Sequence, residues 1–142
     1  MIVARILKDK GRNVVTASPN TPMEEVVRLL VDNRIGALVI LENDSLVGII
    51  SERDIVCALS SHGAAIMQEP ASQHMTKNVI TCTEQDTVQH LKEDMTKHRF
   101  RHIPVVEDGK LFGIVSIGDV VKLRLAVIEM EAESMRDYIK TG

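Results

Sequence analysis

The sequence repeats itself, because residues 14–56 and 79–121 align without a gap at a shift of 65 positions. The identical pairs include Arg34/Arg99, Glu42/Glu107, Leu46/Leu111, Gly48/Gly113, Ile49/Ile114, Ser51/Ser116 and Asp54/Asp119. Residues 3–7 and 71–75 also correspond, but at a shift of 68, so the first repeat has three extra residues, which we place within 8–12. In a chain of 142 residues, such a duplication predicts two similar halves that share a core.

Each repeat contains an apolar strand that stops at a serine, Ser51 in the first copy and Ser116 in the second. A helix is predicted to begin there, with Asp54 or Asp119 at its third position, in a carboxylate variant of the capping box. The free N–H groups of a helix N-terminus suit a phosphate. A carboxylate beside them can accept both hydrogen bonds from a ribose diol. Capping alone explains one copy, whereas two copies in register favour a nucleotide cleft.

The remaining pattern predicts an α+β fold with the order β-α-β-β-α in each repeat. For the first repeat we expect strands at 14–16, 37–41 and 46–50, and helices at about 22–33 and 52–60. Thr21 is the expected N-cap of the first of these helices, with Pro22 at its first position. In the second repeat, Asp86 is the expected helix cap, and Asp108-Gly109 predicts a tight hairpin turn.

Composition narrows the classes of function. The net charge is -3, with 17 basic and 20 acidic residues, and Phe100, Phe112 and Tyr138 are the only aromatic residues. A generic nucleic-acid binder needs a basic face and aromatic platforms, so nucleic acid is excluded as a partner. Cys57 and Cys82 match no zinc spacing, and we expect both to be buried thiols in a reducing compartment. No apolar run approaches the ~20 residues of a membrane helix, so we expect a cytoplasmic protein without a membrane partner.

Other polar groups favour structural interpretations. His90, Asp94 and His98 recur at helical spacing, where a metal site and a solvated face are both possible and the solvated face is favoured. The basic residues at 8–12 either contact a phosphate or form a solvated turn, and the turn is favoured. No catalytic grouping accompanies Ser51 or Ser116, so no catalytic residue, catalytic cofactor or metal is expected.

The blocks GIISERDIV at 48–56 and RHIPVVEDGKLFGIVSIGDVV at 101–121 resemble the cystathionine-β-synthase (CBS) domain family. The resemblance spans about residues 3–125 and implies a stand-alone pair of pseudo-symmetric repeats packed into one module, a Bateman module. We divide the chain into repeat 1 (1–62), a linker (63–70), repeat 2 (71–125) and a C-terminal helical extension (126–142). The resemblance also implies two clefts for AMP, ADP, ATP, NAD(H) or S-adenosylmethionine, and a role as a sensor that signals to a partner protein.

The resemblance places residues in each cleft. In one cleft, Ser116 and Asp119 would hold the ribose and Arg101 or His102 the phosphates, with adenine against Thr21, Val26, Ile35, Gly36, Ala37 and Ile114. The other cleft would use Ser51 and Asp54 for the ribose and Arg53 for the phosphate, beside Ile49, Asp86, Leu91 and Phe100. Arg53 is matched by Gly118, and Gly36-Ala37 by Arg101-His102, so the two clefts should differ in affinity or ligand.

Two alternatives to a sensor stay open at this point. One is a nucleotide-processing enzyme with Asp54 or Asp119 as base and His102 as acid, and the other is a structural adaptor in which the Ser-x-x-Asp blocks are only caps.

The last helix is predicted to run well past the second repeat, because residues 119–141 contain neither Pro nor Gly. Val121, Leu125, Ile128, Ala132, Met135 and Ile139 recur at alternating spacings of four and three. This apolar stripe either packs back on its own module or contacts a second copy. We expect the second arrangement, a homodimer.

Overall fold

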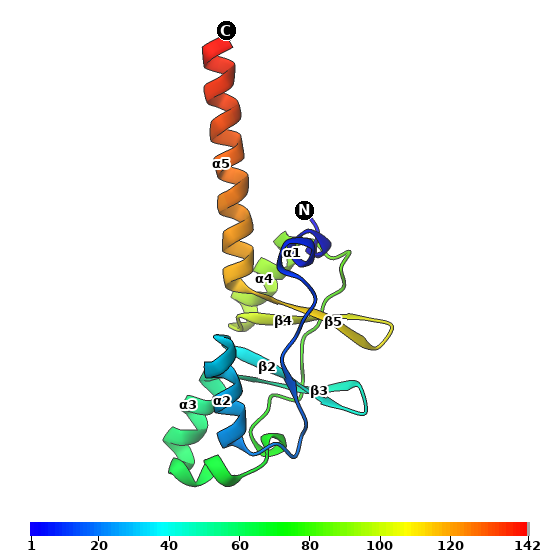
Figure 1. Cartoon of the computed structure of the whole chain (residues 1–142), viewed down its shortest axis with the longest axis vertical. Helices are drawn as coiled ribbons and strands as arrows, with labels where there is room; N and C mark the ends of the chain where they lie inside the picture. The colour runs from blue at the N-terminus through cyan, green and yellow to red at the C-terminus, as the bar shows by residue number, and fades with distance from the viewer. Residues whose placement is uncertain (142) are drawn as a thin grey trace.

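The computed structural model describes residues 1–141 as two stacked halves, with a long helix rising from one of them (Figure 1). The first half contains β1 (Thr16–Ala17), α2 (Met23–Asn33), β2 (Ala37–Glu42), β3 (Ser45–Ser51) and α3 (Glu52–His62). The second half contains α4 (Val88–His98), β4 (His102–Glu107), β5 (Lys110–Ser116) and α5 (Ile117–Thr141). Helix α1 (Val3–Lys10) precedes the first half, and the 3₁₀ helices η1 (Gly63–Gln68) and η2 (Ala71–Gln73) lie between the halves in sequence. The halves meet where β3 contacts β5.

The sheets confirm the α+β fold, with one asymmetry between the repeats. In the first half, β1 pairs with β2 in parallel, and β2 pairs with β3 in antiparallel register. In the second half, β4 and β5 form a two-stranded antiparallel sheet. The strand expected before them is reduced to a single parallel bridge from Cys82 to Val105. The Cys82 N–H donates to Pro104 O at 3.0 Å, and Cys82 O accepts from the Val106 N–H at 2.8 Å.

Both hairpins turn through left-handed backbone, as their sequences require. Asn43 and Asp44 have φ of 51° and 64°, and Asp108 and Gly109 have φ of 49° and 77°. Positive φ at both central positions is the signature of a type I′ turn, whose twist matches that of the flanking strands. The hairpin predicted at Asp108-Gly109 is therefore confirmed.

The expected cap of α2 is wrong by one residue. Pro22, with ψ of 145°, is the N-cap, and the first helical residue is Met23. Thr21 makes no cap bond to this helix; its Oγ1 instead accepts a hydrogen bond from the Ser18 N–H at 3.1 Å. The Thr-Pro pair therefore closes a turn before the helix begins.

The expected cap of α4 is also displaced. Thr87 is the N-cap, and its hydroxyl accepts from the His90 N–H at 3.1 Å. Asp86 instead accepts from the Thr83 N–H at 2.8 Å, so its carboxylate stabilises the preceding turn. Asp86 and Thr87 are adjacent and both can cap a helix, so the residue types alone do not decide at which of them α4 begins.

The segments that precede the two repeats cross over between the halves. Val3 and Leu7 of α1 are fully buried in the core of the second half, together with Leu91 and Ile103. Ala71, which follows the first repeat, is buried in the core of the first half. The Val3 N–H donates to Asp86 O at 2.9 Å. Boundaries drawn along the sequence therefore do not separate the two cores in space.

The strand glycines create the room for this exchange. A Cβ added to Gly113 would lie 2.8 Å from Leu7 Cδ2, and one added to Gly48 would lie 2.5 Å from Met75 Sδ. Leu7 and Met75 correspond at the shift of 68, so each half receives an equivalent side chain from the other segment. Glycine inside a strand often marks a close approach, and at Gly48 and Gly113 the approaching groups are side chains.

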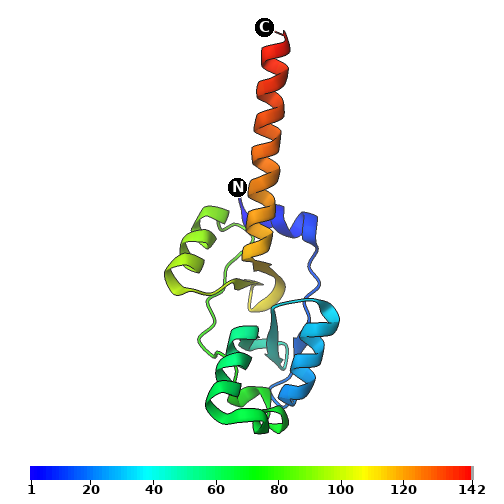
Figure 2. The ribbon, with the colours of Figure 1, turned by 90° about the vertical axis from the view of Figure 1, so that its left-hand side faces the viewer.

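Helix α5 confirms the predicted C-terminal extension. Its first turns are anchored by the buried Val120 and Leu123, and the remainder projects away from both halves (Figures 1 and 2). The stripe that was predicted along it is solvent-exposed: Val121 50%, Leu125 55%, Ile128 44%, Met135 61% and Ile139 71%, with Ala132 also exposed. Packing of this stripe on its own module is therefore ruled out in this structure. Within residues 1–141, no helix combines the length and apolar composition that crossing a membrane requires.

The two cysteines differ in environment. Cys82 is buried as expected, and burial, followed by Asp86, raises the pKa of its thiol to about 12. Cys57 lies on α3 and is exposed, so the prediction that it is buried is wrong. It stands next to the exposed Val56, on the outer face of a helix whose buried residues are Ile55 and Ala58.

Candidate functional site

A cavity of about 550 Å³ opens between the two halves beside the start of α3. The first half contributes Gly36, Ile49, Ser51, Glu52, Arg53, Asp54 and Val56. The segment leading into the second half and the start of β4 contribute Thr76, Asn78, Val79, Ile80, Arg99, Phe100, Arg101 and His102. We call this space the Asp54 cavity. Its volume lies in the range of small-molecule sites, and aliphatic walls with a few polar groups are typical of them.

Asp54 stands at the mouth of helix α3 in a complete capping box. Its Oδ2 accepts from the Ser51 N–H at 2.9 Å and from the Ser51 hydroxyl at 3.2 Å, and the Asp54 N–H donates to Ser51 Oγ at 3.3 Å. Its Oδ1 has only a long hydrogen bond, 3.4 Å, from the Thr76 hydroxyl. The carboxylate is therefore oriented by Oδ2, while Oδ1 has only this weak bond to Thr76, another residue that lines the cavity. A ligand hydroxyl can take that place.

Cationic side chains gather on the other walls of the Asp54 cavity. Arg53 follows the capping serine on α3, Arg99 ends α4, and Arg101 precedes β4. All three guanidinium groups belong to exposed residues and remain hydrated. Guanidinium groups match phosphate oxygens in a bidentate geometry. Asp54 with Arg53 beside it on α3, and Arg99 and Arg101 from the second half, fit a ligand with a diol and a phosphate.

His102 forms the inner wall beside Gly36, where an added Cβ would lie 3.2 Å from His102 Cε1. Burial and then Lys10 hold the pKa of His102 below its usual 6.5, with Arg101 acting in the same direction. Asp119 and Glu52 oppose this shift without reversing it. His102 is therefore neutral at pH 7, where it can offer one donor and one acceptor to a ligand but no full charge.

The Asp54 cavity unites residues that the resemblance had divided between two clefts. Arg101, His102 and Gly36 were expected beside Asp119, and they line this cavity together with Asp54. His102 also pairs with Ser116 across the β4–β5 hairpin, and the charges of Lys10 and Asp119 act on its pKa, so it lies between the two capping boxes. Of the residues expected with Asp54, the cavity contains Ser51, Arg53, Ile49 and Phe100.

Other residues expected to contact adenine lie elsewhere. Val26 and Leu91 are fully buried in the two cores, and Ala37 is 4% exposed, so these side chains offer little surface. Thr21 and Asp86 lie in the turns before α2 and α4 and hold backbone hydrogen bonds there. Ile35 packs on the core of the first half.

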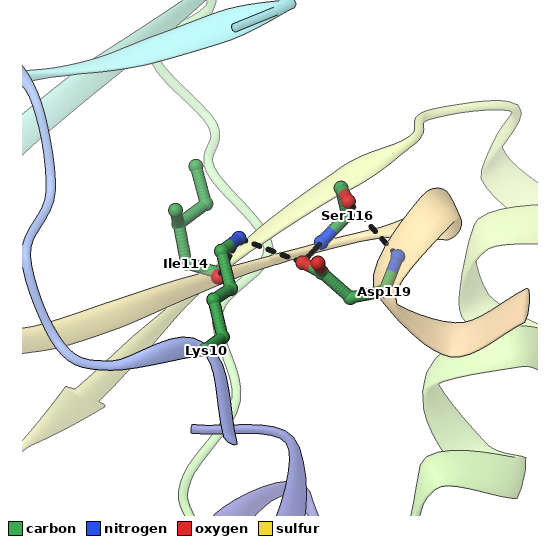
Figure 3. A network of polar contacts seen from close by, with 4 residues as sticks. All are labelled: Lys10, Ile114, Ser116 and Asp119. Carbon is green, nitrogen blue, oxygen red and sulfur yellow. Dashed lines mark hydrogen bonds and ion pairs between the residues drawn. The ribbon is translucent and has the colours of Figure 1, made fainter. Parts of the chain in front are cut away.

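The second Ser-x-x-Asp motif forms an equivalent capping box that is occupied by a lysine (Figure 3). Asp119 Oδ2 accepts from the Ser116 N–H at 2.8 Å, and the Asp119 N–H donates to Ser116 Oγ at 3.2 Å. The Lys10 ammonium donates to the same Oδ2 at 2.7 Å and to Ile114 O at 2.8 Å. Burial opposes ionisation of Asp119, but the hydrogen bonds from Lys10 and Ser116 outweigh it and hold the pKa below its usual 3.8.

The basic segment at 8–12 is exposed, as expected, but two of its side chains form ion pairs. Its first three residues end α1, Lys10 bonds Asp119, and Arg12 pairs with Glu84. Sequence reasoning missed Lys10 as a functional residue, because its partner lies 109 positions away.

Sequence reasoning also missed most of the residues that the second half contributes to the wall of the Asp54 cavity. Thr76, Asn78, Val79 and Ile80 enter it from the segment before the second repeat, and Arg99 from the end of α4. The duplication in the sequence could have identified this wall. Residues 8–10 and 76–78 correspond at the shift of 68, so whatever lines one capping box is expected to have a counterpart at the other.

The possible metal ligands do not converge. His90 Nε2 lies 3.4 Å from Asp94 Oδ2 on the exposed face of α4, and His98 stacks against Phe100 at a centroid distance of 5.8 Å. Among residues 1–141, no group of three His, Cys, Asp or Glu side chains is placed to hold a metal ion.

Comparison with known proteins agrees with this architecture. The family model of the CBS domain matches residues 6–61 and again residues 71–126. A mitochondrial CBS domain-containing protein of Arabidopsis thaliana is 30% identical over 149 residues, which covers 99% of this chain and 72% of the relative.

Solved structures extend the comparison. A CBS-domain containing protein from Agrobacterium tumefaciens is 46% identical, with a TM-score of 0.85 over 87% of this chain and 99% of the other. The CBS domain pair of protein MJ0100, solved in complex with 5'-methylthioadenosine and S-adenosyl-L-methionine, is 31% identical. Its TM-score is 0.79 over 89% of this chain and 97% of that chain.

Proposed function

The chain belongs to the CBS domain family, and from that premise we propose that it is a regulatory module that binds an adenine nucleotide in the Asp54 cavity. One observation carries the proposal: the Asp54 carboxylate, oriented by its capping box, faces the same space as Arg53 and Arg101. The carboxylate accepts hydrogen bonds from the ribose diol, and the arginines bind phosphate. Ligand occupancy is then signalled to a partner protein.

The walls of the cavity suit a flat base. Ile49, Val79 and Ile80 provide aliphatic surface, and Gly36 leaves room that a side chain would fill. Support for an adenosyl ligand comes from the MJ0100 domain pair, which was solved with two such compounds. We propose AMP, ADP or ATP as the ligand class, with NAD(H) as a larger candidate of the same chemistry.

The test is a thermal-shift series with the full chain and AMP, ADP, ATP, NAD, S-adenosylmethionine and adenosine, followed by calorimetric titration of the compounds that raise Tm. Ligand binding to the folded state stabilises it by mass action, so saturating nucleotide should raise Tm. If none of these compounds shifts Tm or gives binding heat, the adaptor alternative is favoured and the proposal fails.

An enzymatic role is the second candidate, and we place it behind the sensor. His102 and Asp54 both line the cavity. The His102 ring, however, lies against Gly36, and the Asp54 carboxylate accepts a hydrogen bond from the Ser51 N–H. Long incubation of nucleotide with the protein, followed by chromatography, separates the two candidates. Unchanged nucleotide supports the sensor, and a product that forms in proportion to protein concentration supports the enzyme.

We also propose that the module forms a homodimer through α5. Its exposed stripe is a continuous apolar surface on a helix that leaves the body of the chain. Sedimentation over a concentration series should show a dimer for the wild type and weaker association for Leu125→Glu/Ile128→Glu. Lys122→Glu, on the exposed polar face, is the control and should sediment as the wild type does. Equal association of all three proteins would remove α5 from the interface.

The free thiols of Cys57 and Cys82 support our proposal of a reducing, cytoplasmic location.

A further inference from the structure

Lys10 is held in place by the packing of its own helix. Val3, Ile6 and Leu7 are buried in the second core, and Leu7 lies against Gly113. The last turn of α1 is therefore fixed over β5, where Lys10 bonds Ile114 O and Asp119 Oδ2 (Figure 3). The ammonium group is held by these two hydrogen bonds, although the Lys10 side chain is 33% exposed, and it stands where the second capping box would meet a ribose.

The two capping-box carboxylates consequently differ in charge balance. Asp54 accepts its hydrogen bonds from neutral groups, Ser51 and Thr76. Asp119 accepts from the Lys10 cation at 2.7 Å. A charge-assisted hydrogen bond is about twice as strong as a neutral one. A ribose hydroxyl that displaced Lys10 from Asp119 Oδ2 would exchange the stronger bond for a weaker one, whereas on Asp54 Oδ1 it would replace only a 3.4 Å contact.

The duplication shows that most of the cationic groups of the Asp54 cavity have no cationic counterpart in the other half. Arg53 corresponds to Gly118, Arg101 to Gly36 and His102 to Ala37 at the shift of 65. Lys10 itself corresponds at the shift of 68 to Asn78, a neutral residue that lines the Asp54 cavity. The Asp119 half of the molecule therefore has no cationic counterpart of Arg53, Arg101 or His102, keeps Arg34 as the counterpart of Arg99, and has one cation bonded to its carboxylate.

We propose that Lys10 is an internal occupant of the Asp119 site that excludes nucleotide from it, so that each chain binds one nucleotide, at Asp54. This inference rests on the proposed function, because it specifies which of two duplicated sites takes the ligand. The pseudo-symmetric module becomes functionally asymmetric through a single side chain from the opposite repeat.

Calorimetric titration of AMP into the full chain tests this proposal. The wild type should bind one AMP per chain, and Lys10→Ala should gain a second, weaker site while its first site keeps the wild-type Kd. Lys8→Ala removes the same charge from the same exposed helix turn and should keep one site. The double variant Asp54→Ala/Lys10→Ala should retain the new site after losing the first.

The outcomes separate the two hypotheses. Two sites in the wild type, or one unchanged site in Lys10→Ala, would overturn the role of Lys10 and leave the proposed function standing. Weaker binding at the first site of Lys10→Ala would identify Lys10 as a ligand contact and would also overturn its role as an occupant. Failure of the wild type to bind AMP, ADP, ATP or NAD would overturn the proposed function, and this inference with it. Circular dichroism of each variant establishes that α1 has stayed folded.

Discussion

Replacing Asp54 by alanine should weaken AMP binding without abolishing the fold. The lost interaction is a hydrogen bond between a carboxylate and the ribose diol, and bonds to charged groups contribute about 1.5–3 kcal/mol. Asp54 Oδ1 holds only a 3.4 Å contact in the free protein, so most of that free energy is gained when ligand binds. The dissociation constant for AMP should therefore rise roughly tenfold to a hundredfold.

The same substitution also removes a helix cap, and the assay must separate the two effects. Loss of an N-terminal cap costs about 0.5–2 kcal/mol of stability. Thr87→Ala removes the cap of α4, whose hydroxyl accepts from the His90 N–H at 3.1 Å, outside the Asp54 cavity. Urea unfolding should show comparable destabilisation of both variants, whereas calorimetry should show weakened AMP binding for Asp54→Ala alone.

Two results would refute this reasoning. An unchanged Kd for Asp54→Ala in a folded protein would exclude the ribose contact. An equal loss of affinity in Thr87→Ala would mean that AMP binding follows overall stability, and that the Asp54 carboxylate has no direct role.

Further predictions concern charge and exposure. Arg101→Ala and Arg53→Ala should each weaken AMP binding about tenfold or more while adenosine binding stays within about twofold, because only AMP carries a phosphate; equal losses for both ligands, compared by calorimetry, would make the arginines structural. The folded-state pKa of His102 is lowered, so the unfolded state takes up the proton first and the free energy of unfolding should fall as pH drops below 6.5. In urea titrations between pH 5 and 7.5, the free energy of unfolding should depend less steeply on pH for His102→Gln than for the wild type. An identical pH dependence of the two proteins would contradict the lowered pKa of His102. A thiol reagent should modify Cys57 in the native protein and reach Cys82 only after unfolding, and rapid native modification of both would contradict the burial of Cys82.

The parts of the fold that follow from local pattern could be predicted from the sequence. The capping boxes depend on residues three positions apart, and the hairpin at Asp108-Gly109 depends on its own backbone. The continuation of α5 followed from the absence of Pro and Gly over residues 119–141. These features are decided within one or two turns of chain, where propensity and capping act directly.

The exchange of α1 into the second core could not be predicted in this way. Val3 and Leu7 are apolar residues that suit either half, and nothing local selects between two similar cores. The correspondence of Leu7 with Met75, each facing a strand glycine, becomes informative only when the halves are placed side by side. The pairing of Lys10 with Asp119 follows from the same exchange.

The division of the site residues between two clefts stays a prediction for a related reason. Arg101 and His102 lie between the halves, and the duplication alone does not say which capping box they face. The resemblance placed them with Asp119; in the structure both line the Asp54 cavity, and the charges of Lys10 and Asp119 also act on His102. The residues of each Ser-x-x-Asp motif could be identified from the sequence. The other residues that face each motif depend on how the two sheets pack against each other.

A crystal structure of the full chain grown with AMP tests the central claim most directly. The account predicts AMP in the Asp54 cavity, with its ribose hydroxyls on the Asp54 carboxylate, its phosphate toward Arg53 or Arg101, and Lys10 still bonded to Asp119. AMP bound at Asp119 with Lys10 displaced, while the Asp54 cavity stays empty, would contradict it.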